Sequence, residues 1–219
     1  MRDYILEKNS TTPKYFTFGN IEVHIEDKIS NDLDPKQVLI SIEKVLPRSF
    51  FNNLKKIYIG DFDHFEERNV NAMYNDNKLY ISNKQDNYQD IVDDVVHEIA
   101  HHLETQHIED IYGDGDIKKE FLKKRKQLEF ELRSEGLWTD EYDFEDLKFD
   151  KKFDDFLYKR VGKNLLRMMT SGIFIRPYAS VSLREYFATG VEAYYVGDRD
   201  ILSKISPRLY EKIKRLNNL

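Results

Sequence analysis

Residues 88–105, YQDIVDDVVHEIAHHLET, contain the pattern from which the rest of the chain is best interpreted. The polar residues Asp86 and Asn87 come directly before this stretch and are typical of a helix N-terminus. At about 100° per residue, its apolar side chains fall in a single arc; they are Ile91, Val92, Val95, Val96, Ile99, Ala100 and Leu103. We therefore predict a helix that buries one face in a core and presents the opposite face to a second surface.

Residues 97–101 of this helix read His-Glu-Ile-Ala-His. Four residues advance an α-helix by about 400° and about 6 Å, so His97 and His101 lie one above the other, opposite the apolar arc. Both imidazoles can then reach one metal ion. Glu98 lies at the rim of the same face, where a carboxylate can accept a proton from an activated water. We predict two metal ligands and one general base.

Composition limits the other parts of such a site. The 219 residues include no cysteine, so a metal must be held by His, Asp or Glu. With 34 Lys+Arg and 40 Asp+Glu, the net charge is −6, and we expect neither nucleic acid nor an anionic membrane as partner. The N-terminus lacks a signal-peptide pattern, and no run of apolar residues is long enough to span a bilayer. These features predict a cytoplasmic protein.

The residues before this helix have the pattern of a small sheet. Alternation over residues 16–25 predicts a strand, and Asp34-Pro35 predicts the start of a helix that continues to residue 46. Residues 54–62 read as a second strand. Residues 71–82 read as two short strands around an Asn-Asp-Asn turn.

The residues after it are mostly helical by pattern. We predict helices over 120–136, 149–169, 182–195 and 206–216. The Lys/Arg cluster at 118–126 and the acidic run at 140–150 are expected to be solvated faces. The prediction is one domain, 1–219, which divides into an α/β sheet subregion (1–85), the active-site helix (86–106), a helical insert (107–177) and a C-terminal pair of helices (178–219).

A hydrolytic zinc site has three protein ligands, and the sequence offers two candidates for the third. One is His107, because the spacing from His97 fits HExxHxxGxxH of the metzincins, with Met168-Met169 available for a Met-turn. The glycine of that pattern, which lets the helix break, is Glu104 here. The other candidate is Glu185, although Ser182-x-x-Glu185 also matches a capping box that satisfies a helix N-terminus.

Three segments resemble the catalytic domain of the anthrax-lethal-factor-like zinc metallopeptidases, a family that includes the Pro-Pro endopeptidases. They are HEIAHH at 97–102, PYASVSLREYFATGVEAYY at 177–195 and SPRLYEKI at 206–213. The resemblance covers residues 70–105 and 170–215. It implies an α+β zincin-like fold and a Zn²⁺ gluzincin site in which Glu185 is the third ligand. It also implies that Tyr178 points its phenol at the metal.

The chain departs from that family at one supporting position. The family often has an acidic residue four positions after the third ligand, where this chain has Thr189. Its acidic residue is Glu192, seven positions after Glu185, and the sequence leaves open whether Glu192 supports a histidine or lies on the surface. The insert is long compared with the smallest members, and its helices resemble those of lethal-factor-like proteins encoded by phages, for which association with the virion is an alternative location.

The resemblance implies a zinc endopeptidase that acts on a protein or peptide. The strand at 78–82 or its hairpin partner at 71–74 can pair with an extended substrate as an exposed edge. Two alternatives stay open. One is a catalytically silent binding or structural module, for example a phage virion or assembly component. The other is hydrolysis of something other than a peptide, since the motif specifies an activated water more firmly than its target.

Overall fold

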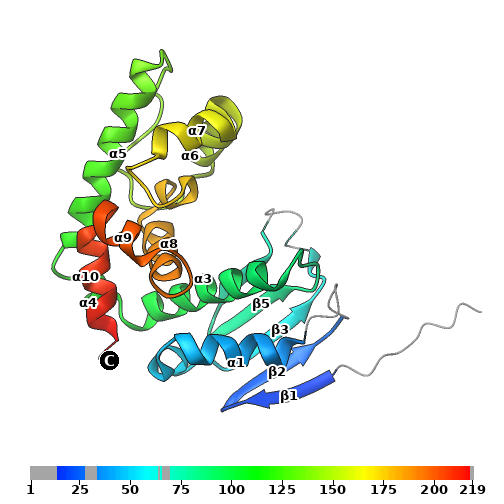
Figure 1. Ribbon diagram of the computed structural model, residues 1–219. Coiled ribbons are helices and arrows are strands. Elements are labelled where there is room, and N and C mark those ends of the chain that lie inside the picture. The colour runs from blue at the N-terminus through cyan, green and yellow to red at the C-terminus, as the bar shows by residue number, and fades with distance from the viewer. Residues whose placement is uncertain (1–13, 28–33, 64, 66–69, 218–219) are drawn as a thin grey trace, which may run out of the picture.

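The computed structural model describes residues 14–27, 34–63, 65 and 70–217, and it contains a five-stranded mixed sheet (Figure 1). The strands, in the spatial order β1-β2-β3-β5-β4, are β1 (Lys14–Phe18), β2 (Ile21–Ile25), β3 (Lys56–Gly60), β5 (Lys78–Ser82) and β4 (Ala72–Asn75). The inner strands β2, β3 and β5 are parallel, and both edge strands pair antiparallel. Parallel neighbours need a crossover, and α1 (Pro35–Val45) provides it between β2 and β3.

Turns at the two edges of the sheet reverse the chain tightly. The prediction of one strand over 16–25 is wrong, because the chain turns at Gly19, which has φ 57°, and pairs Phe18 with Ile21. The alternation of side chains continues on both sides of this turn and hides it. The predicted hairpin over 71–82 is confirmed, and Asp76 and Asn77 both have positive φ, as a two-residue hairpin turn requires.

The remaining elements are helical, which confirms an α+β fold with a mostly helical C-terminal half. The α-helices are α3 (Tyr88–Gln106), α4 (Ile108–Tyr112), α5 (Asp116–Ser134), α6 (Lys151–Asp155), α7 (Lys163–Thr170), α8 (Leu183–Tyr195), α9 (Arg199–Ile205) and α10 (Pro207–Leu216). The described residues also form the short 3₁₀ helices η2 (Arg48–Phe51) and η4 (Pro177–Ser180) and the π-helix η3 (Phe156–Gly162). The helical stretch predicted over 149–169 is confirmed, but it consists of α6, η3 and α7, because Gly162, with φ 86°, departs from helical geometry.

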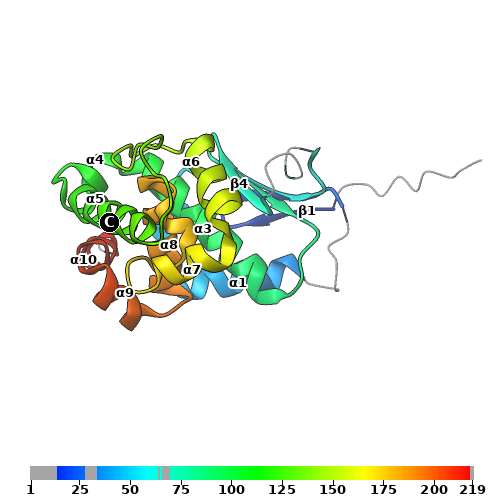
Figure 2. The same cartoon turned by 90° about the horizontal axis from the view of Figure 1, so that it is seen from above.

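Helix α3 lies between the sheet and α8, as Figures 1 and 2 show. The predicted apolar arc of α3 is confirmed, since all seven of its side chains are buried. The opposite face of α3 packs against α8 and not against solvent. The buried apolar side chains form one continuous cluster that extends from Ile21 on the sheet to Leu216 on α10.

Helix α5 stands beside α10, away from the sheet (Figure 1). The prediction of a solvated Lys/Arg cluster at 118–126 is wrong for Lys124 and Arg125, which are 7% and 1% exposed. Lys124 Nζ donates to the carbonyls of Ile173 and Ile205, and Arg125 donates to those of Ser180, Val181 and Asp143. The other four cations of that cluster are exposed, and the acidic side chains at 140–150 are exposed or half-buried as predicted.

In the described part of the chain, no helix has both the length and the apolarity needed to cross a membrane.

Candidate metal centre

Helix α3 brings the side chains of His97, Glu98 and His101 together at its face toward α8. Asn87 caps the helix by accepting from the N–H groups of Gln89 and Asp90, so α3 starts where the sequence predicts. The imidazoles of His97 and His101 are 4.8 Å apart between ring centres and meet edge to face. Ligand atoms of His97, Glu98 and His101 all lie within 4.8 Å of one another, so this group can hold a metal ion.

Helix α8 adds the carboxylate of Glu185 to the two histidines. Its Oε2 atom lies 3.0 Å from His97 Nε2, and its Oε1 atom lies 3.5 Å from His101 Nε2. The capping interaction is present too, because the backbone N–H of Glu185 donates to Ser182 Oγ at 3.1 Å. The two interpretations of Glu185 are therefore compatible: the backbone satisfies the helix N-terminus while the side chain contacts both imidazoles.

The types of side chain at this point fit a metal. Glu185 meets the two imidazoles through different oxygens, at 3.0 and 3.5 Å, so its carboxylate lies within reach of an ion held by both histidines. Two imidazole nitrogens and a carboxylate are ligand types that zinc accepts in a site without thiolates. The donor set therefore fits the metal that the sequence predicts.

Glu98 is a second carboxylate beside the two imidazoles, and it has a different partner from Glu185. Its Oε2 atom accepts the backbone N–H of Tyr74 at 2.6 Å, which ties the side chain to strand β4. Glu98 is 8% exposed and lies beside the two imidazoles. A carboxylate tied through one oxygen keeps its second oxygen for proton transfer, which matches the role predicted for Glu98.

Charges at the centre favour an ionised Glu185. Burial opposes ionisation of this carboxyl, but hydrogen bonds with His101 and His97 bring its pKa well below the usual range. Burial also disfavours a charged His101, and contacts with the carboxylates of Glu104 and Glu185 outweigh it and raise the pKa of His101. A divalent cation requires an anionic carboxylate and neutral imidazoles, so Glu185 is ready for it, while its binding would displace the proton that these contacts favour on His101.

Tyr178 lies beside His97, as the resemblance implies. The two ring centres are 6.3 Å apart. Tyr178 is part of η4, directly before α8, and Arg125 holds the end of this turn through the carbonyl of Ser180 at 2.7 Å. Burial raises the pKa of the Tyr178 phenol, with added effects of nearby acidic groups, so the phenol keeps its proton and can donate a hydrogen bond.

The structure does not bring His107 to the centre. Helix α3 ends at Gln106, and Nδ1 of His107 lies 3.2 Å from Asp110 Oδ2. Met168, one of the methionines proposed for a Met-turn, is 67% exposed on α7. The metzincin pattern in the sequence therefore does not correspond to an assembled site.

The remaining histidines have other surroundings. His24 stacks on Tyr58 at 5.1 Å between ring centres, and His102 Nε2 lies 2.7 Å from the carbonyl of Asn52. Neither contact involves His97 or His101, and His64 lies outside the described residues.

Four residues around the histidines are absent from the sequence prediction or left undecided by it. Glu192, the undecided one, is 9% exposed, and its Oε2 atom lies 3.4 Å from His97 Nδ1. Its spacing of seven from Glu185 was the available signal, because seven residues make two helical turns and return to the same face. Glu104, Arg176 and Arg184 also contact the centre. Glu104 lies three residues after His101 on the same helix, and this spacing was an available signal. The two arginines reach the centre from other segments, so a local pattern could not find them.

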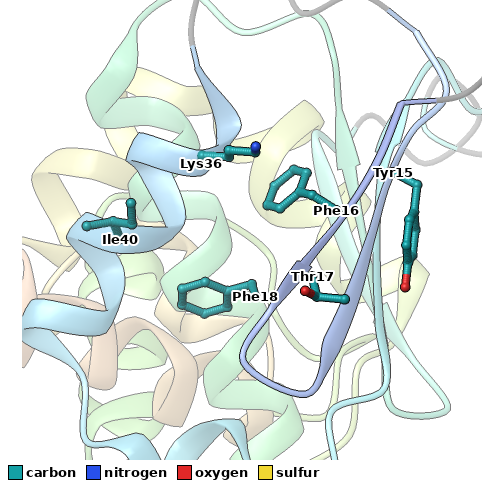
Figure 3. A pocket seen from close by; sticks show the side chains of 6 residues that line it. All are labelled: Tyr15, Phe16, Thr17, Phe18, Lys36 and Ile40. Carbon is teal, nitrogen blue, oxygen red and sulfur yellow. The ribbon is translucent and has the colours of Figure 1, made fainter.

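A hollow with a volume of about 580 Å³ lies elsewhere, between β1 and α1 (Figure 3). Phe16, Phe18 and Ile40 line it, and the Lys36 ammonium lies 5.0 Å from the centre of the Phe16 ring. None of the described residues that line it is a histidine or a carboxylate, in contrast to the group on α3.

No protein-family model, no curated protein and no solved structure matches this chain.

Proposed function

We propose that the chain is a zinc-dependent endopeptidase of the gluzincin type, with a zincin-like fold similar to that of the anthrax-lethal-factor-like metallopeptidases. One observation carries the proposal above all: the carboxylate of Glu185, from a helix 88 residues away, contacts the Nε2 atoms of both histidines of the HExxH motif. If Glu185 served only to cap the N-terminus of α8, its side chain would not need to contact either imidazole.

His97, His101 and Glu185 would hold the ion. Among the carboxylates near the histidines, Glu185 is preferred as the ligand because it contacts the Nε2 atoms of both imidazoles. Glu98 is tied to Tyr74, and Glu104 and Glu192 face the Nδ1 atoms. A bound Zn²⁺ supplies an activated water near neutral pH and polarises the scissile carbonyl.

The residues of the chain provide the proton transfers. Glu98 accepts the proton of the attacking water through its second oxygen and delivers it to the leaving amine. The Tyr178 phenol donates a hydrogen bond to the oxyanion that forms as the carbonyl carbon becomes tetrahedral. The C–N bond then breaks, and the amine leaves with the proton from Glu98.

Strand β4 offers the place for a peptide substrate. Among the described strands it is the outermost one beside β5, and its Tyr74 N–H places it directly beside Glu98. An extended peptide can add to such an edge through main-chain hydrogen bonds, which would present its carbonyl to Glu98 and the ion.

Metal content and cleavage of a random peptide library test the proposal together. We expect about one zinc per chain in the wild type, which is lost in His101→Ala and Glu185→Ala, whose side chains are ligands. His107→Ala is the matched control, because it removes a histidine side chain that lies away from the centre, and it should retain the metal. Zinc without cleavage of any peptide would favour the silent binding module. A chain that takes up no zinc, even when zinc is added back, would refute the proposal.

A further inference from the structure

Each histidine of the centre has a second ring nitrogen that needs a partner. When Nε2 binds a metal, Nδ1 carries the proton and must donate it, and this hydrogen bond fixes the tautomer and the ring orientation. The groups that face the two Nδ1 atoms therefore decide how well the pair is prepared for a metal. Any role for these groups rests on the proposed function, because it requires the zinc centre.

Nδ1 of His97 faces a carboxylate that is held by an arginine. Glu192 Oε2 lies 3.4 Å from this nitrogen and also contacts the guanidinium of Arg176. The carboxylate is 12% exposed, while the arginine side chain is 41% exposed. We call Glu192 and Arg176 the first pair.

Nδ1 of His101 faces the same combination of groups. Glu104 Oε2 lies 3.8 Å from it, and Arg184 Nε lies 3.4 Å from the same oxygen. Tyr112 donates its hydroxyl proton to the other Glu104 oxygen at 2.5 Å. Glu104 is also 12% exposed, and Arg184 is 48% exposed. We call Glu104 and Arg184 the second pair.

We propose that the first pair orients His97 and the second pair orients His101, so that Glu192 and Glu104 are positioning residues of the metal centre. The two arginines come from positions 176 and 184, on either side of the turn that carries Tyr178. The two pairs therefore also connect the histidines of α3 to the segment that carries the Tyr178 phenol.

Stability does not explain why these pairs exist. An ion pair with one half-exposed partner contributes little to folding, because solvent screens it and the arginine loses side-chain entropy. Both carboxylates are instead directed at ring nitrogens of the two histidines.

The second pair has a feature that sharpens the inference. Arg184 Nε lies 3.0 Å from His101 Nδ1, closer than the Glu104 oxygen does. An arginine N–H can only donate, so on its own it favours the tautomer with the proton on Nε2, which competes with a metal. Glu104 is then needed both to accept from Nδ1 and to draw the guanidinium away from it.

Zinc and cobalt affinities of the full chain, measured by competition with a chelator, test the inference without using catalysis. We expect Glu192→Ala and Glu104→Ala each to lower both affinities by about 10–100-fold, with a changed visible spectrum of bound cobalt. Glu192→Gln keeps an acceptor oxygen and should lose less than Glu192→Ala. Glu104→Ala/Arg184→Ala should bind more tightly than Glu104→Ala, because the competing donor is gone.

Glu129→Ala is the matched control, since it breaks an ion pair with Arg133 on α5 and should leave both affinities unchanged. Circular dichroism and thermal unfolding show whether each variant is folded. If Glu192→Ala does not fold, the metal affinities of the isosteric Glu192→Gln are compared with those of the wild type instead. Folded alanine variants with wild-type affinity would overturn the inference and leave the proposed function standing. A wild type that binds neither metal would overturn the proposed function itself.

Discussion

The residues before α3 and those after it contribute to the candidate centre in different ways. The residues before α3, which we call the sheet side, provide a backbone group, since the N–H of Tyr74 on β4 donates to Glu98. The residues after α3, which we call the helical side, provide side chains: Glu185 contacts both histidines, and Tyr178 lies beside His97. A backbone contact survives most side-chain changes, whereas a side-chain contact does not. Substitutions on the helical side should therefore alter the chemistry more than substitutions on the sheet side.

The largest effect is expected at Glu98, which stands between the two sides. Glu98→Gln keeps the shape of the side chain but cannot accept a proton, so kcat should fall by about 10²–10⁴-fold. Zinc content should stay at the wild-type level, because the proposed mechanism uses Glu98 as a base and not as a ligand. Peptide cleavage rates and metal analysis on the same preparation check both parts, and loss of zinc in this variant would instead make Glu98 a ligand.

Tyr178→Phe tests the contribution of the helical side. It removes one hydrogen bond to the developing oxyanion and should lower kcat by about 10²–10³-fold, with little change in zinc affinity. Steady-state kinetics on a fixed peptide give the number. An unchanged kcat would show that the phenol is only a packing residue.

Arg125→Met tests how the helical side holds the turn that carries Tyr178. It leaves the carbonyls of Ser180, Val181 and Asp143 without their buried donor, so the free energy of unfolding should fall by about 2–4 kcal/mol. Urea unfolding measures the change. Lys126→Met, which changes the exposed neighbour of Arg125, is the control. It should change the free energy of unfolding by less than about 0.5 kcal/mol.

Gly190→Ala tests the contact between α8 and α10. A Cβ atom at this position would lie 2.4 Å from Leu209 Cδ2, too close for the helices as they are packed, and should cost about 1–3 kcal/mol of unfolding free energy. The double variant Gly190→Ala/Leu209→Ala makes room for the methyl group. Its cost should be less than the sum of the two single substitutions, and simple additivity would argue against the close approach.

Tyr74→Phe should have the smallest effect and is the counterpart of Tyr178→Phe on the sheet side. It keeps the backbone N–H that binds Glu98 and removes only hydroxyl contacts with Asn77 and His102. We expect an unchanged kcat and a loss of about 0.5–1.5 kcal/mol in the free energy of unfolding. A large fall in kcat here would break the contrast between the two sides.

Local periodicity predicted those features that depend on neighbours in the sequence. The apolar arc of α3, the position of His97 and His101 and the hairpin turn at Asp76-Asn77 all follow from spacings of a few residues. The choice of Glu185 as the third ligand came from resemblance and not from spacing, since 84 residues separate it from His101.

Features that depend on distant partners could not be predicted in this way. Lys124 and Arg125 look like other surface cations in the sequence, and what buries them is a set of backbone carbonyls up to 81 residues away. Every residue type has a backbone carbonyl, so the sequence does not indicate which carbonyls accept from these two cations. The contacts of Arg184 with Glu104 and His101 are equally hidden, because Arg184 comes from another helix.

X-ray absorption at the zinc edge tests the central claim most directly, because it reports the atoms around the ion. For the purified wild type we expect bound zinc surrounded by about four nitrogen and oxygen atoms at about 2.0–2.1 Å, including the scattering pattern of two imidazoles. His107→Ala should give the same spectrum. A chain without bound zinc, or zinc without imidazole scattering, would contradict the account.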